Sequence, residues 1–173
     1  MRKIVTTPTR GARRKHPDQC AGCGASEDPD CISTRFTLPD ALGVPRGAGA
    51  REVLGRDPIL LVPGEAGWVR VLLRVRLTEG ASLLLATWLE VGWDAAGALM
   101  ASWDTPAYDG LVLDGVLANA VPPWGMLGAR ARARVGDPDL LPHIAESVDP
   151  LLARVLADVW PYGKVAEAFG RAP

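Results

Sequence analysis

Hydrophobic and polar residues alternate clearly in residues 68–77, WVRVLLRVRL. Four aliphatic side chains fall on one face of the strand that this pattern predicts: Val69, Val71, Leu73 and Val75. The opposite face carries arginines together with Leu72. After a short turn, residues 83–91 are almost continuously apolar, which is typical of a central strand covered on both faces. The two segments predict an antiparallel hairpin at the centre of the fold.

Two further segments alternate with the period of a strand that has one buried face. Residues 129–135, ARARARV, show the strictest alternation in the chain, and residues 32–38 form a shorter example. Residues 111–121 are apolar but ambiguous between strand and helix. In the ARARARV segment the outward positions are Arg130, Arg132 and Arg134. These arginines would form a row on the outside of the sheet.

Helical periodicity appears in two places. Residues 93–103 predict a helix with Asp94 as its N-cap, and a second helix follows Asp149 as N-cap and Pro150 at its first position. The apolar stripe of this second helix consists of Leu151, Leu152, Val155, Leu156, Val159 and Trp160. Residues 39–58 are rich in glycine and proline and predict a long loop with at most one helical turn.

The order of these elements indicates the fold class. The strands are not regularly separated by helices, which argues against a parallel doubly wound sheet. We therefore expect an α+β fold, with a mainly antiparallel sheet covered by a C-terminal helix. We divide the chain into a disordered basic arm over 1–15, a cysteine-rich, zinc-knuckle-like loop over 16–38, and a single α+β domain over 39–173. The length of 173 residues, with 48% hydrophobic and 23% charged, suits this division.

Charge is distributed unevenly along the chain. Six basic residues and no acid precede Asp18, so 13 of the 19 basic side chains remain to balance 20 acidic ones. Such an arm suits either a nucleic-acid tether or a solvated terminus, and the acidic remainder favours the terminus. Nucleic acid is therefore not an expected partner. Residues 1–15 lack the apolar core of a signal peptide, and no apolar run could span a bilayer, so we expect a cytoplasmic protein without a membrane partner.

All three cysteines and one of the two histidines lie within residues 16–31, HPDQCAGCGASEDPDC. Cys20 and Cys23 have the CxxC spacing that lets a tight turn direct both thiolates at one ion, and the glycines around them allow that turn. Together with Cys31 and His16 they number four, the set of N and S ligands that structural zinc prefers. The cluster therefore predicts a structural zinc site.

Alternatives to this zinc site remain open. His143 or a water molecule could replace His16 as the fourth ligand. A redox-active CxxC pair and three unligated thiols are the other interpretations. The redox interpretation is disfavoured, because a redox CxxC normally opens a helix after a strand, and no such pattern surrounds these cysteines.

Acidic and aromatic residues gather between positions 88 and 114. We predict a pocket formed by Trp88, Glu90, Trp93, Trp103, Asp104, Tyr108 and Asp109. Carboxylates in such a pocket could transfer protons or bind a hard cation. The alternative is that the aspartates cap helices and turns while the tryptophans fill the core, and this interpretation is favoured by their positions. The arginine row has two interpretations as well, a surface for an anionic ligand or partner and a solvated strand face.

Several short motifs resemble a bacterial family catalogued as domain-of-unknown-function family 2199. They are the CxxCG knuckle CAGCG, the basic strand WVRVLLRVRL, the tryptophan strand TWLEV and the segment VLANAVPPW, which closes on a proline-aromatic turn. The resemblance spans most of residues 20–160 and implies no activity. Cys31 has no counterpart in the family pattern, so its place among the metal ligands rests on spacing alone.

The motif content bears on the class of function. The sequence contains no GxSxG, Walker A, GxGxxG or HExxH motif, and its two histidines leave little room for histidine-based catalysis. We expect a noncatalytic bacterial binding or interaction protein with a structural zinc knuckle, of immunity or adaptor type and with a protein partner. The alternative is a small metalloenzyme or biosynthetic accessory enzyme that uses the cysteine-bound metal or the acid and tryptophan pocket.

Overall fold

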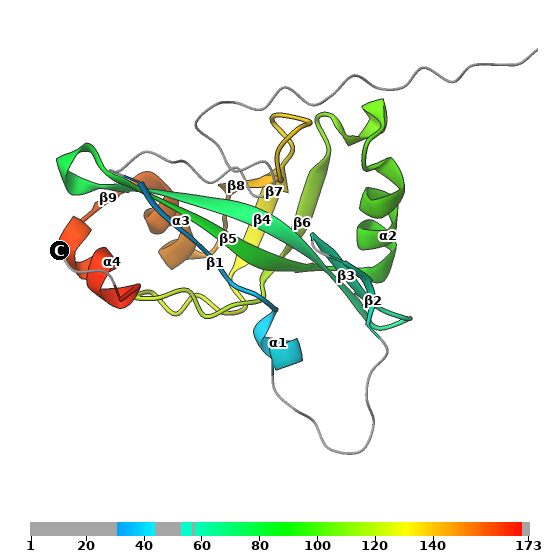
Figure 1. The fold of residues 1–173 in the computed structure, drawn as a ribbon, viewed down its shortest axis with the longest axis horizontal. Coiled ribbons are helices and arrows are strands. Elements are labelled where there is room, and N and C mark those ends of the chain that lie inside the picture. The colour runs from blue at the N-terminus through cyan, green and yellow to red at the C-terminus, as the bar shows by residue number, and fades with distance from the viewer. Residues whose placement is uncertain (1–30, 44–52, 57, 171–173) are drawn as a thin grey trace, which may run out of the picture.

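The structure, a computed structural model, describes residues 31–43, 53–56 and 58–170. Within these ranges the chain forms an α+β fold (Figure 1). The strands are β1 (Cys31–Arg35), β2 (Leu54–Arg56), β3 (Ile59–Val62), β4 (Ala66–Leu77), β5 (Ser82–Val91), β6 (Val112–Leu117), β7 (Arg130–Arg134), β8 (His143–Glu146) and β9 (Val159–Trp160). The α-helices are α1 (Asp40–Gly43), α2 (Trp93–Ser102), α3 (Pro150–Ala157) and α4 (Tyr162–Ala168). The α2 helix and the α3–α4 region lie at opposite ends of the molecule.

Five of the strands close into a barrel. Antiparallel pairing links β4 to β5, β5 to β6, β6 to β7 and β7 to β8, and a parallel contact between Leu72 and His143 returns β8 to β4. Outside the ring, β1 runs parallel to β5, β3 and β2 extend from β4, and β9 pairs with the end of β4. Six of the nine described pairings are antiparallel, as the sequence predicts.

The interior of the barrel is filled by the alternating residues of β4 and the strands that follow it. Val69, Val71, Leu73 and Val75 are each 0% exposed. Burial of one such side chain stabilises the fold by about 1.5–3 kcal/mol. Residues 83–89 of β5 are buried without interruption, because the outer face of the hairpin is covered too. The predicted central hairpin is therefore confirmed.

The β6–β7 pair buries one face only. Ala131 and Ala133 point into the core, while the three arginines of β7 are exposed, as the alternation predicts. The ambiguous segment 111–121 forms strand β6 and then irregular chain. A Cβ atom at Gly115 would lie 2.3 Å from the backbone oxygen of Glu90, so glycine is what allows β6 to approach β5 this closely.

Several local predictions need correction. The N-cap of α2 is Gly92, which provides no side-chain hydrogen bond, and Asp94 lies in the first turn. The predicted loop 39–58 contains the single helical turn α1 but also strand β2. Three short strands and one helix were not predicted: β3, β8, β9 and α4. The predicted arm 1–15 and most of the predicted knuckle 16–38 lie outside the described residues.

The helix that follows Asp149 is shorter than the sequence predicts. Asp149 caps α3 as predicted, accepting hydrogen bonds from the amides of Leu151 and Leu152 at 3.0 Å. Leu152 and Val155 are fully buried. The apolar stripe stops early, because the helix ends at Ala157 and Val159 enters β9 with 55% of its surface exposed. A sheet covered by one C-terminal helix is therefore not confirmed.

In the described part of the chain, no helix is long and apolar enough to cross a membrane.

Candidate functional site

The seven residues of the predicted pocket lie in different places, and two of them are on β5. Trp88 is 1% exposed and lies under Arg70, whose guanidinium carbon is 4.4 Å from the indole centroid. Arg70 also donates a hydrogen bond of 2.6 Å to the carbonyl of Phe36. Glu90 accepts a hydrogen bond of 3.2 Å from the indole N–H of Trp68. These contacts join β4 and β5 to the chain that follows β1.

The remaining pocket residues surround α2 and the turn after it. Trp93 begins the helix and packs on the core. The rings of Trp103 and Tyr108 lie 4.6 Å apart, and the Tyr108 hydroxyl donates to the carbonyl of Leu140 at 3.0 Å. Two aspartates of this segment are exposed: Asp104 and Asp109. Trp103 and Tyr108 are thus brought together.

Of the predicted metal ligands, Cys31 and His143 are described. Cys31 begins β1 and is 8% exposed, in a cluster whose other members are Leu72, Leu84, Ala86 and Leu141. His143 begins β8 and is exposed. The other predicted ligands lie outside the described residues: His16, Cys20 and Cys23. No group of three potential metal ligands occurs among the side chains that the structure describes.

Asn119, which sequence reasoning did not single out, lies at the centre of a buried polar network. The side chain is 0% exposed. Its amide nitrogen donates to the carbonyl of Leu38 at 2.9 Å and to Asp40 Oδ1 at 2.8 Å. Its oxygen accepts from the Trp88 amide and from the Thr87 hydroxyl, both at 3.1 Å. The side chain thus bonds to Leu38 and Asp40 on one side and to β5 on the other. The network therefore holds the segment around α1 against β5 and the chain that follows β6.

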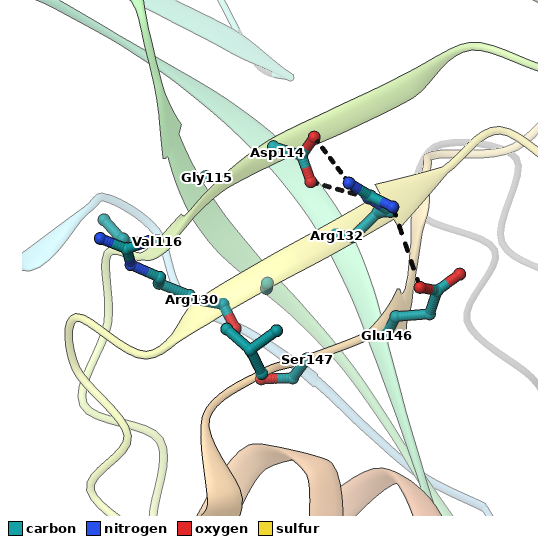
Figure 2. A pocket seen from close by; sticks show the side chains of 9 residues that line it. Asp114, Gly115, Val116, Arg130, Arg132, Glu146 and Ser147 are labelled. Carbon is teal, nitrogen blue, oxygen red and sulfur yellow. Dashed lines mark hydrogen bonds and ion pairs between the residues drawn. The ribbon is translucent and has the colours of Figure 1, made fainter.

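A groove with a volume of about 550 Å³ lies on the outer face of β6, β7 and β8 (Figure 2). Its lining comprises Asp114, Gly115, Val116, Arg130, Ala131, Arg132, Glu146, Ser147 and Val148. None of the seven predicted pocket residues is part of this lining. The groove does contain two members of the predicted arginine row, which makes this face the candidate site.

In one half of the groove, the charged side chains form ion pairs with one another. Arg132 binds both oxygens of Asp114, with Nε 2.8 Å from Oδ1 and Nη2 3.2 Å from Oδ2. Glu146 lies between two arginines, with Oε1 2.5 Å from Arg134 Nη2 and Oε2 3.9 Å from Arg132 Nη1. The four charges therefore neutralise one another across three strands.

This pairing shifts both members of the Asp114–Arg132 pair toward their charged forms. The hydrogen bond from Arg132 lowers the pKa of Asp114 below its usual value. The same hydrogen bond raises the pKa of Arg132. A carboxylate held in this way is a poor proton acceptor near neutral pH, so the pair is suited to fixing charge in place and poorly suited to proton transfer.

The other half of the groove is open. Arg130 lies opposite Val116 in the strand register, and its guanidinium extends beside that valine (Figure 2). Within the described residues, the Arg130 guanidinium has no hydrogen bond or ion pair. Ser147 donates a 2.6 Å hydrogen bond to the carbonyl of Arg130 and accepts one from the amide of Asp149 at 3.0 Å. Val148, between these two anchors, is 81% exposed.

The sequence predicts the arginines of this site but not the residues around them. The alternation of ARARARV places the arginine row outside, but it cannot distinguish the paired Arg132 and Arg134 from Arg130, because their partners come from other strands. Glu146, Ser147 and Val148 were missed. The cap signature at Asp149 and Pro150 marks the loop in which two of them lie, yet nothing local places that loop beside β7.

Comparisons with protein-family models, with curated proteins and with solved structures found no match. The resemblance to family 2199 therefore stays a prediction.

Proposed function

We propose that this protein is a noncatalytic interaction protein, of immunity or adaptor type, that recognises a protein partner through the β6–β7–β8 groove. The observation that carries the proposal is that one groove is lined both by the exposed Val148 and by a cation, Arg130, that has no partner among the described residues. A charged group beside an exposed aliphatic side chain is a combination that a protein interface can bury, because it offers both orientation and apolar contact.

The rigidity of the rim supports this function. Arg130 extends from a strand, and Val148 is held between Ser147, bonded to β7, and Asp149, which caps α3. A backbone that is hydrogen-bonded before binding loses less conformational entropy when a partner arrives. The direction of the Asp114 pKa shift supports binding over acid–base catalysis, because a general base works best with a pKa near the working pH.

Peptide selection tests the proposed surface. A random dodecapeptide library displayed on phage is selected on the wild-type protein, and the recovered clones are then bound to Val148→Asp and Val159→Asp. Val148 and Val159 are 81% and 55% exposed, so neither aspartate should disturb folding. Val148→Asp removes the apolar contact from the groove and replaces it with a charged side chain, and we expect it to abolish binding.

The control, Val159→Asp, makes the same chemical change outside the groove and should leave binding intact. Clones that bind both variants equally, or a selection that recovers no clone, would contradict the proposal.

We also propose a structural zinc site, on the spacing of Cys20, Cys23 and Cys31, with His16 as the fourth ligand. Zinc bound there would order the N-terminal segment and take no part in a reaction. Metal analysis of protein purified under reducing conditions should find about one zinc ion per chain. Three freely reactive thiols and no metal would exclude the site. Loss of zinc in His143→Ala but not in His16→Ala would instead assign the fourth position to His143.

A further inference from the structure

We propose that the occupant of the groove is an extended peptide segment of the partner that carries a carboxylate and a branched aliphatic residue on one face. This inference rests on the proposed function and specifies the chemistry that the same groove recognises.

The sign of the ligand's charge follows from which groups of the groove are already paired. Asp114 has both oxygens bound to Arg132, and Glu146 lies between Arg132 and Arg134. The charges of the two acids are therefore already balanced by arginines. Arg130 is the lining charge without a partner in the described part of the chain, and it is positive. Charge complementarity selects an anion.

A carboxylate suits this position well. A guanidinium presents its N–H groups in a planar fork that matches the two oxygens of a carboxylate. In the part of the chain that the structure describes, no acid competes for Arg130, since Asp114 of β6 and Glu146 of β8 pair with Arg132 and Arg134. An incoming aspartate or glutamate can therefore bind the guanidinium without breaking an existing ion pair.

The aliphatic residue follows from the valines on either side of Arg130. Val116 lies opposite Arg130 on β6, and Val148 lies on the far side of β7, in the loop that Ser147 anchors to Arg130. In an extended segment, alternate residues face the same side. A segment crossing the groove can thus put its acid on Arg130 and another side chain of the same face on one of the two valines.

A peptide fits the groove better than a free anion does. An inorganic anion would satisfy Arg130 but leave Val148 exposed. An ion pair that stays exposed to water contributes little to affinity, so an apolar contact that shields the Arg130–carboxylate pair is needed for useful binding. The groove also spans three strands and is far larger than one anion requires.

The test uses the most enriched dodecapeptide from the selection described above, made synthetically and labelled with a fluorophore. Its dissociation constant is measured by anisotropy on the wild type, on Arg130→Gln and on Arg74→Gln. Arg74 is an exposed arginine of β4 outside the groove and serves as the matched control. Arg130→Gln should weaken binding about tenfold, the loss expected for one charge-assisted hydrogen-bonded pair, and Arg74→Gln should not.

A second peptide, with its acid changed to the amide, completes a double-mutant cycle. It should bind the wild type about tenfold more weakly and lose nothing further on Arg130→Gln, because the same contact is already missing. Raising the salt concentration should weaken the acidic peptide and leave the amide peptide nearly unchanged.

The outcomes separate this inference from the proposed function. Selected peptides that depend on Val148 but are basic, or neutral without an acid, would overturn the inference and leave the interaction function standing. Failure to recover any clone that depends on Val148 would overturn both. If N-acetylglutamate competes as strongly as the whole peptide, the site belongs to a small carboxylate and the peptide inference is wrong.

Discussion

The β4–β5 and β6–β7 pairs are both antiparallel ribbons of one barrel, and they differ in what covers their outer faces. In β5, residues 83–89 are all buried, because side chains of other elements lie against the outside of the hairpin as well as the inside. In β7 the inward alanines are buried while every arginine is exposed. The first ribbon is thus buried on both faces over most of its length, with Arg74 and Arg76 of β4 exposed, and the second has a core face and a solvent face.

The difference shows in how each ribbon accommodates charge. Arg70, on the covered outer face of β4, is 3% exposed, lies over Trp88 and donates to a backbone carbonyl. On the open face of β6–β7, Arg132 pairs with an acid of the neighbouring strand, while Arg130 has no described partner. A buried cation must be satisfied within the protein, whereas a solvated one can be left for another molecule.

The largest effect is expected from one substitution made in both ribbons. Val71→Asp, at a site that is 0% exposed, should unfold the protein, because burying an unpaired carboxylate costs a large part of the total stability. Val112→Asp changes a valine that is 46% exposed on β6 and should leave the fold intact. Circular dichroism and gel filtration of the two variants distinguish them. A folded Val71→Asp protein would mean that this face of β4 is not part of the core.

An intermediate effect is expected at the buried polar network. Asn119→Ala removes the partner of four hydrogen-bonding groups in the interior, and we expect the free energy of unfolding to fall by about 3 kcal/mol. Urea denaturation provides the measurement. Arg130→Gln, on the open face, should change the free energy of unfolding by less than about 0.5 kcal/mol. Equal losses in the two variants would remove the distinction between the ribbons.

The smallest effect is expected from pH at the Asp114–Arg132 pair. The pKa of Asp114 is lowered in the folded state, so its contribution to stability is present above its unfolded-state pKa and is lost as the pH falls through the folded value. Wild type should therefore exceed Asp114→Asn in melting temperature at neutral pH, and the difference should vanish in strong acid. It should also shrink with added salt, because the pair is exposed. A difference that is the same at every pH would show that the ion pair does not form in solution.

Where a local pattern determines the structure, the sequence was sufficient. The period-2 alternation identified the buried residues of β7 and the inward face of β4, and the continuous apolar run identified β5 as covered on both faces. It did not show that Trp68, Arg70 and Leu72 on the other face of β4 are buried too. The cap of α3 was recognised because its donors lie two and three residues from Asp149. In contrast, β3, β8 and β9 span four, four and two residues, too few to show a period.

The sequence by itself thus determined which residues form the core strands and which side of β7 faces solvent, because hydrophobic periodicity acts within a single element. Tertiary structure alone decided that β8 closes the barrel, that Asn119 meets Asp40 across 79 positions, and that Asp114 and Glu146 neutralise two arginines but not Arg130. Those contacts depend on strand register and on the closure of long loops. Which arginine of β7 keeps no partner among the described residues is therefore decided only when β6 and β8 lie beside it.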